Sequence, residues 1–155
     1  MKRFTIAPAG AADLPAVAEL FQEYAAALPV DLGAQGFIEE LAELPGSYKA
    51  PRGTLLLARF DGGDACGCVA LRPLTENACE VKRLYVSPSA RGAGIGRALV
   101  SALLSEARHL GYREVKLDTL SNMIEAISLY RSFGFRPIPP TARTPTTAFF
   151  ASANH

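Results

Sequence analysis

The chain has 155 residues, of which 49% are hydrophobic and 20% charged, and its 16 basic and 15 acidic residues leave a formal net charge of +1. This length predicts a single domain over residues 1–155 that buries its own core without a disulfide or a metal as a staple. The composition excludes a disordered chain, and the balanced charge argues against broad electrostatic binding to nucleic acid or to a membrane.

The start of the chain and its cysteines indicate where the protein works. The basic residues at positions 2 and 3 are not followed by the apolar segment of a signal peptide, and no apolar run is long enough to cross a membrane. The odd number of cysteines suits a reducing compartment, so we expect a cytoplasmic protein. Cys66, Cys68 and Cys79 lack the spacing and the fourth ligand of a metal site, so we expect small core residues and no metal.

Hydrophobic patterns in the first half of the chain predict a strand, two helices and a three-stranded meander. Asp13 is placed to cap the first helix, Pro29 ends it, and the segment 61–64 carries a strong turn signal between two of the later strands. The expected elements are a strand over 4–6, a helix between Asp13 and Pro29, a helix near 37–44, a loop over 47–53, and strands over 54–60, 65–71 and 79–86.

In the second half of the chain, helices and strands alternate. An apolar helical face runs over 94–110, and Gly111 is placed as the C-terminal cap of this helix. The other expected elements are a strand over 114–120, a helix over 123–133 and a last strand over 146–151. This order predicts a mixed α/β fold in which helices flank a mostly antiparallel sheet with one parallel crossover.

The segment that leads into the 94–110 helix carries the most informative sequence, Arg91-Gly92-Ala93-Gly94-Ile95-Gly96-Arg97, called the glycine loop below. Glycine lets the backbone approach a ligand closely, and the first amides of a helix lack partners within the helix and lie at the positive end of its dipole. These features form a cradle for a phosphate or pyrophosphate, to which Arg91 and Arg97 would add charge and forked donors.

Three other interpretations fit the glycine loop less well. A nucleotide-binding P-loop would need Lys and then Ser or Thr after the last glycine, where Arg97 and Ala98 stand. A dinucleotide fingerprint would find its ribose-binding acid in Asp118, but Leu99 stands near the place of the third glycine and the preceding strands are antiparallel hairpins. Close packing of a helix on a sheet needs fewer glycines and no flanking arginines.

The glycine loop matches Arg/Gln-x-x-Gly-x-Gly/Ala, the acetyl-CoA pyrophosphate loop of the GNAT family of N-acetyltransferases. A second match follows, since Leu129-Tyr130-Arg131-Ser132-Phe133-Gly134-Phe135 resembles the family's Leu-Tyr-x-x-x-Gly-Phe and is preceded by the expected small residue, Ala126. Both motifs occur in the family's order and at its separation. The chain therefore resembles this family over residues 54–135, and its first strand and helices are compatible with it.

The resemblance implies direct transfer of an acetyl group from acetyl-CoA to a primary amine, in a small molecule or a peptide, within a ternary complex. It implies that the strand over 79–86 splays from the strand over 114–120, with the pantetheine arm of CoA in the gap. Backbone groups of Leu84, Tyr85 and Val86 would pair with the pantetheine, and the Val86 N–H would polarise the thioester carbonyl. The amides of the glycine loop would hold the pyrophosphate.

Tyr130 is the candidate acid. The resemblance places it beside the CoA sulfur, where it would donate a proton to the departing thiolate, and simple packing on the buried helix face is the alternative. The asparagine that many relatives carry three residues before the Ala126 position is absent, because Met123 stands there. Either Asn122, one residue earlier, makes this contact with CoA instead, or the contact is missing.

Glu80 is the candidate base, because it stands where some family members carry the glutamate that accepts the amine's proton. A surface salt bridge to Lys82 or Arg83 is the alternative role of Glu80, and a water chain is the alternative base. Strand alternation puts Glu80, Lys82, Leu84 and Val86 on one face unless a bulge intervenes.

The sequence is least informative about the acceptor amine. Lys49 and Arg52, in the loop over 47–53, either favour an acidic acceptor or point to solvent. A non-catalytic acyl-CoA-binding sensor of the same fold is the alternative function, and the sequence leaves a homodimer open.

Overall fold

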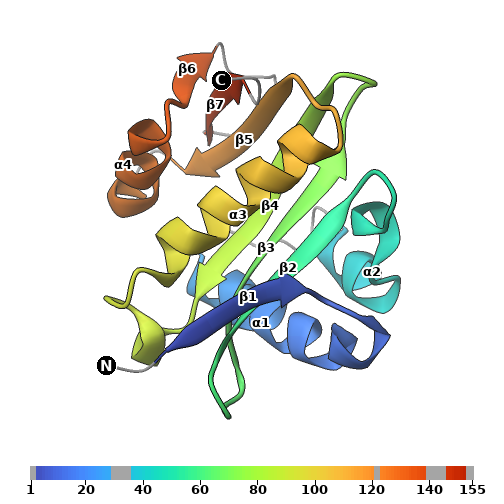
Figure 1. Cartoon of the computed structure of the whole chain (residues 1–155), viewed down its shortest axis with the longest axis vertical. Helices are drawn as coiled ribbons and strands as arrows, with labels where there is room; N and C mark the ends of the chain where they lie inside the picture. Colours follow the sequence, from blue (N-terminus) through green and yellow to red (C-terminus); the bar gives the residue numbers. More distant parts are fainter. Residues whose placement is uncertain (1–2, 29–35, 121–122, 139–145, 153–155) are drawn as a thin grey trace.

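The computed structural model describes residues 3–28, 36–120, 123–138 and 146–152 (Figure 1). The described residues form one sheet of seven strands in the order β1-β2-β3-β4-β5-β7-β6, in which β4 and β5 pair parallel and the other neighbours pair antiparallel. The strands are β1 (Phe4–Pro8), β2 (Thr54–Phe60), β3 (Ala65–Pro73), β4 (Ala78–Val86), β5 (Glu114–Leu120), β6 (Arg136–Ile138) and β7 (Thr146–Ser152). The predicted mixed α/β fold is confirmed.

The α-helices of the described residues are α1 (Leu14–Ala27), α2 (Phe37–Ala42), α3 (Ile95–His109) and α4 (Ile124–Ser132). They and most of the strands lie where the sequence predicts them, but the sequence does not predict strand β6 or three short 3-10 turns at Ala11–Asp13, Gly46–Tyr48 and Pro88–Ala90. The second of these turns occupies the start of the expected 47–53 loop. None of the described helices is long and apolar enough to cross a membrane.

Asp13 occupies the N-cap position of α1 but does not cap the helix through its side chain. Its carboxylate instead accepts a hydrogen bond from the Gly10 N–H at 2.8 Å and forms an ion pair with Arg59 at 2.8 Å. The predicted N-cap position is therefore confirmed, but the side chain of Asp13 closes the 3-10 turn before α1 and ties that turn to β2 instead of binding an amide of the helix.

Helices cover both faces of the sheet (Figure 1). On one side, α3 and α4 bury a core that includes Leu99 and Tyr130. On the other, α1 and α2 bury a second core that includes Phe21 and Phe37. These two sides are called the α3 face and the α1 face below.

Gly67 in β3 lets α3 rest close to the sheet. A Cβ at this position would lie 3.1 Å from the backbone oxygen of Tyr85 and 3.2 Å from side-chain carbons of Ile95 and Leu99. Both Ile95 and Leu99 are buried residues near the start of α3. The absence of a side chain at Gly67 therefore sets how deeply the start of α3 packs against β3 and β4.

The strands β4 and β5 pair only over their first halves. The paired residues run from Ala78 with Glu114 to Val81 with Leu117, whereas β4 continues to Val86. Beyond Val81, no described strand pairs with β4 on the side of β5. This divergence, called the splay below, confirms the predicted separation and leaves backbone groups of β4 available to another partner.

A β-bulge interrupts β4 at Arg83. This residue has a φ of 60°, in the left-handed region that non-glycine residues rarely adopt, and the register with β3 shifts between Cys68 and Ala70. Two residues of β4 therefore stand opposite one residue of β3 at this point, and the alternation of side chains changes there.

The bulge corrects the expected facing of the end of β4. Lys82 pairs with Ala70, which belongs to the core of the α1 face, and Glu80 precedes it by two positions on the same face. Leu84 and Val86 instead pack against the core of the α3 face. The four side chains do not share one face, because the exception attached to that prediction applies: the bulge reverses the alternation between Lys82 and Leu84.

Candidate active site

Tyr130 lies on α4, within the core of the α3 face to which Leu84 and Val86 also belong. Its ring packs edge-on against Phe135, with centroids 5.6 Å apart, and the residue is 6% exposed. Burial raises the pKa of Tyr130, with a smaller contribution from the nearby phenol of Tyr24, so the hydroxyl stays protonated at neutral pH. No described residue forms a hydrogen bond with this hydroxyl, which is free to donate to a ligand.

Three segments singled out from the sequence meet around Gly96. A Cβ at Gly96 would lie 3.7 Å from side-chain carbons of both Val86, at the end of β4, and Leu129, beside Tyr130 on α4. The end of β4, the first turn of α3 and the helix that carries Tyr130 are therefore neighbours. The structure brings the two sequence motifs together at the splay.

The glycine loop adopts a conformation that requires glycine. Gly92 and Gly94 have φ values of 89° and 83°, and Gly94 is the N-cap of α3. An added Cβ at either position would meet nothing within 4 Å, so backbone conformation rather than space selects glycine there. The side chain of Ile95 is buried in the core, so this residue can offer only its backbone amide to a ligand.

The two arginines of the glycine loop bind neighbouring segments. Arg91 donates a hydrogen bond from Nε to the backbone oxygen of Val86 at 3.1 Å, which connects the loop to the end of β4. The guanidinium of Arg97 lies 5.3 Å from the ring centroid of Phe133 in the second motif. Both side chains are exposed, so their remaining donors can reach an anion at the start of α3.

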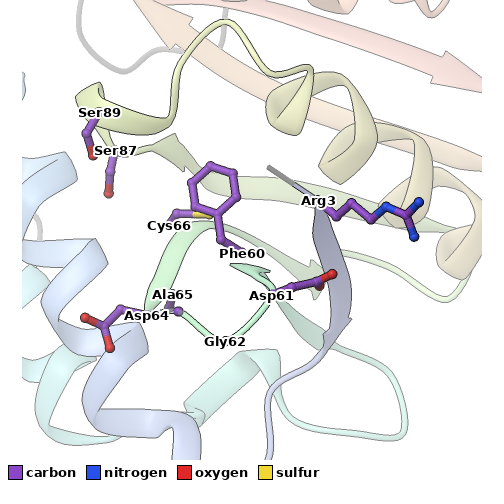
Figure 2. Close-up of a pocket in the computed structure, with 10 residues that line it drawn as sticks. Arg3, Phe60, Asp61, Gly62, Asp64, Ala65, Cys66, Ser87 and Ser89 are labelled. Atoms are coloured by element: carbon purple, nitrogen blue, oxygen red, sulfur yellow. The ribbon is translucent and has the colours of Figure 1, made fainter. Parts of the chain in front are cut away.

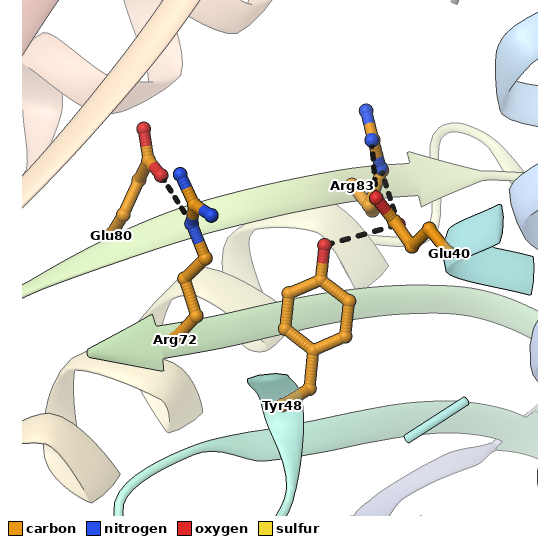
Figure 3. A network of polar contacts seen from close by, with 5 residues as sticks. All are labelled: Glu40, Tyr48, Arg72, Glu80 and Arg83. Carbon is orange, nitrogen blue, oxygen red and sulfur yellow. Dashed lines mark hydrogen bonds and ion pairs between the residues drawn. The ribbon is translucent and has the colours of Figure 1, made fainter. Parts of the chain in front are cut away.

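On the α1 face, Arg83 forms a two-pronged ion pair with Glu40 (Figure 3). Its Nε and Nη2 donate to the two carboxylate oxygens of Glu40 on α2 at 3.0 and 2.8 Å, and the Tyr48 hydroxyl donates to Glu40 at 3.0 Å. Burial alone would raise the pKa of Glu40, but the hydrogen bonds and charge of Arg83 outweigh it and hold that pKa below its usual value. The pair ties α2 to the bulge of β4.

Glu80 is a buried residue whose carboxylate accepts a hydrogen bond from Arg72 Nε at 2.7 Å (Figure 3). The sequence predicts Lys82 or Arg83 as the salt-bridge partner, and the structure corrects this to Arg72. The reason is the register, because Arg72 of β3 stands directly opposite Glu80. Glu80 is thus held on the α1 face, on the side of the sheet opposite Leu84 and Val86.

Tyr24 lies on α1 and is not among the site residues that the sequence predicts. Its ring packs edge-on against Tyr85 with centroids 6.3 Å apart, and the guanidinium of Arg83 lies 5.7 Å from its centroid. Burial raises the pKa of Tyr24, partly offset by the charge of Arg83. Tyr24 therefore links α1 to the end of β4 through its contacts with Tyr85 and Arg83.

Other residues named from the sequence lie elsewhere. Arg52 donates to the backbone oxygens of Thr75 and Glu76 at 2.9 and 3.0 Å, so it fastens a turn. Lys49 is exposed. Asn122 lies outside the described residues, so its predicted contact with CoA stays a prediction.

The three cysteines are confirmed as core residues. Cys66, Cys68 and Cys79 are all buried and unpaired, and their thiols donate to backbone oxygens of Ala58, Arg83 and Glu114. Burial raises the pKa of Cys68 and of Cys79 to about 12. These thiols are therefore poor nucleophiles and metal ligands.

A hollow of 480 Å³ lies at the β2–β3 hairpin (Figure 2). Asp61 and Asp64 line it from the hairpin, and Ser87 and Ser89 line it from the segment after β4. No residue predicted to bind CoA or to transfer a proton contributes to it. The hollow therefore borders the segment between β4 and the glycine loop and includes none of the candidate site residues.

Comparison with known proteins agrees with this geometry. Residues 17–135 match the Acetyltransferase (GNAT) family. The uncharacterized N-acetyltransferase C1271.07c of Schizosaccharomyces pombe is 40% identical over 134 residues, which cover 86% of this chain and 82% of the relative. An acetyltransferase of the GNAT family from Staphylococcus aureus Mu50 has a TM-score of 0.81 at 18% identity, covering 98% of this chain and 100% of that chain.

A further solved structure includes the cofactor. The Salmonella typhimurium protein yncA, determined with its cofactor acetyl-CoA, has a TM-score of 0.73 at 21% identity and covers 99% of this chain and 95% of that chain. The matched length, the identity to the yeast relative and the shared fold agree with one another. The chain therefore belongs to the Acetyltransferase (GNAT) family and is an acyl-CoA-dependent N-acyltransferase.

Proposed function

We propose that the protein transfers the acetyl group of acetyl-CoA directly to a primary amine, with both substrates bound at once. The observation that supports this most strongly is the convergence at Gly96, where the end of β4 and the helix of Tyr130 lie against the first turn of α3. The strand edge beyond Val81 is unpaired among the described strands, so it suits an extended ligand with amide groups.

Acetyl-CoA would bind along this edge. Its pantetheine amides would pair with backbone groups of Leu84, Tyr85 and Val86, as a strand would. The amides of the glycine loop, at the positive end of α3, would hold the pyrophosphate, and Arg91 and Arg97 would add charge. The Val86 N–H would donate to the thioester oxygen as negative charge develops on it.

The reaction needs two proton transfers. The amine nitrogen attacks the thioester carbon, the carbon–sulfur bond breaks, and the acetylated amine loses the proton that it carried. Tyr130 would give its proton to the departing thiolate, which the raised pKa of this phenol permits because it keeps the group protonated. The phenol recovers a proton from solvent after CoA leaves.

Glu80 would take the amine's proton, directly or through a water molecule. Its ion pair with Arg72 orients the carboxylate, and its place on the α1 face lets an acceptor approach the splay from the side opposite Tyr130. Glu80→Gln keeps the shape and a hydrogen-bond acceptor for Arg72, so the fold should persist. We expect kcat to fall about 100-fold with little change in CoA affinity, measured by steady-state kinetics and by titration. Unchanged turnover would assign the base to solvent.

An acceptor screen tests the proposed function. Acetyl-CoA is incubated with the protein and a panel of amino acids, aliphatic amines, aminoglycosides and peptides, and free thiol is measured alongside the acetylated product. We expect at least one amine to release thiol and gain an acetyl group in equal amounts. Tight CoA binding with no acceptor-dependent thiol release across the panel would favour the sensor alternative.

A further inference from the structure

Two ion pairs and a further lysine lie on the α1 face of β3 and β4. Arg72, Lys82 and Arg83 are cations, and Glu40 and Glu80 are the carboxylates among them. Each carboxylate forms an ion pair with one of the two arginines. Lys82 forms no ion pair among the described residues, and the charges of Glu80 and Glu40 act on it only from a longer range.

Lys82 lies between the two ion pairs and beside the splay. It is the first residue of β4 after Val81, where the pairing with β5 ends, and it is half-buried. Its ammonium forms no hydrogen bond or ion pair with any described residue. The residue opposite it in β3 is Ala70, which belongs to the core of the α1 face. Burial lowers the pKa of Lys82, which marks the cost of keeping this charge there without a partner.

Arg72 offers further donors at the same place. Only its Nε is used by Glu80, and its two terminal nitrogens make no hydrogen bond with the described residues. Because Arg72 stands opposite Glu80, it is the diagonal neighbour of Lys82, within the reach of two long side chains. About a third of the Arg72 side chain is exposed, at 34%, so a ligand can reach these nitrogens.

We propose that Lys82 and the terminal nitrogens of Arg72 bind a carboxylate of the acceptor, so that the acceptor is a small amine of the amino-acid class. This inference rests on the proposed function and names the acceptor of the same site. The cationic pair would hold the carboxylate, while Glu80 between them would face the amine. A single acceptor with both groups satisfies the unpaired ammonium and presents its nitrogen at the splay.

Matched acceptor pairs test this inference. Each pair is an amino acid and its primary amide, which differ only in the carboxylate, and kcat/KM is measured for wild type, Lys82→Met, Lys82→Arg and Lys49→Met. The amine of the amide is less basic than that of the amino acid, so more of it is in the reactive neutral form. This difference by itself favours the amide, so a preference for the acid has to overcome it. We expect wild type to favour the acid about tenfold or more, because charge-assisted hydrogen bonds have this strength.

The variants locate the effect. In Lys82→Met the preference should fall to about twofold or less, Lys82→Arg should keep most of it, and Lys49→Met, which removes an exposed lysine charge, should leave it unchanged. The inference is overturned if wild type does not prefer the acid over the amide. It is also overturned if this preference survives in Lys82→Met or is lost in Lys49→Met.

A binding measurement separates this inference from the proposed function. The same acid and amide pairs are titrated into the CoA-bound protein by calorimetry, with wild type and Lys82→Met. If wild type binds the acid more tightly than the amide and Lys82→Met does not, the carboxylate site is supported even when no turnover occurs. In that case only the proposed function is contradicted. Turnover of amides and acids alike, with equal affinities, contradicts the inference and leaves the proposed function standing.

Discussion

Gly67→Ala tests whether the seating of α3 on the sheet governs both stability and CoA binding. The new methyl would lie 3.1 Å from the Tyr85 backbone oxygen and 3.2 Å from carbons of Ile95 and Leu99. A central strand yields little, so the start of α3 must move outward. Overpacking of this kind costs about 1–3 kcal/mol, and the reduced freedom of the unfolded chain returns about 0.5 kcal/mol. We expect a net loss of roughly 1–2 kcal/mol and a fall in Tm of about 3–6 °C.

The assay pairs thermal unfolding with CoA titration. Because the displaced turn begins at Ile95, next to the glycine loop, CoA affinity should fall several-fold in Gly67→Ala. Gly63→Ala is the matched control, since its Cβ would have its nearest neighbour at an ordinary 3.5 Å in the β2–β3 hairpin. If the two variants have the same Tm and the same CoA affinity as wild type, the reasoning about close packing at Gly67 is refuted.

Two further predictions concern the glycine loop and the α1 face. Gly94→Ala forces a non-glycine residue into the left-handed region, which should cost roughly 1–2 kcal/mol of stability and weaken CoA binding about tenfold in a titration. Gly111→Ala is the control, because Gly111 is also left-handed but lies at the far end of α3. This variant should lose similar stability and keep its CoA affinity. Glu40→Gln should destabilise the fold by about 2–3 kcal/mol at neutral pH, because Arg83 is left buried without a carboxylate while Glu40 keeps some exposure. Because folding lowers the pKa of Glu40, the stability that its ion pair contributes is complete above the pKa of the unfolded chain and is lost as the pH falls through the pKa of the folded protein. Denaturant melts should therefore show that the difference in unfolding free energy between wild type and Glu40→Gln shrinks in acid. A difference that stays constant with pH would contradict the ion pair.

The elements and the glycine loop could be predicted because their causes are local. Periodicity places strands such as 54–60 and 114–120 at their observed bounds, since each depends on its own side chains. The positive φ of Gly92 and Gly94 is likewise a local requirement. These features carry the family resemblance, so that resemblance could be recognised without a structure.

The arrangement around β4 could not be predicted, because it depends on residues far apart in the chain. The bulge at Arg83 is fixed by pairing with β3 and by Glu40, which is 43 residues away. The partner of Glu80 follows from the register with Arg72 rather than from its sequence neighbours. The only signal in the sequence is the charged run of Glu80, Lys82 and Arg83 in an otherwise apolar strand, which indicates a polar site without giving its pairs.

The acid role of Tyr130 is the central claim, and Tyr130→Phe tests it most directly. The variant keeps the ring that packs against Phe135 and removes only the hydroxyl, which has no partner among the described residues. We predict that kcat, measured by thiol release with the best acceptor of the screen, falls about 100-fold, while the Kd for CoA changes by less than about threefold. Turnover equal to wild type, or equal losses in turnover and CoA affinity, would contradict the account.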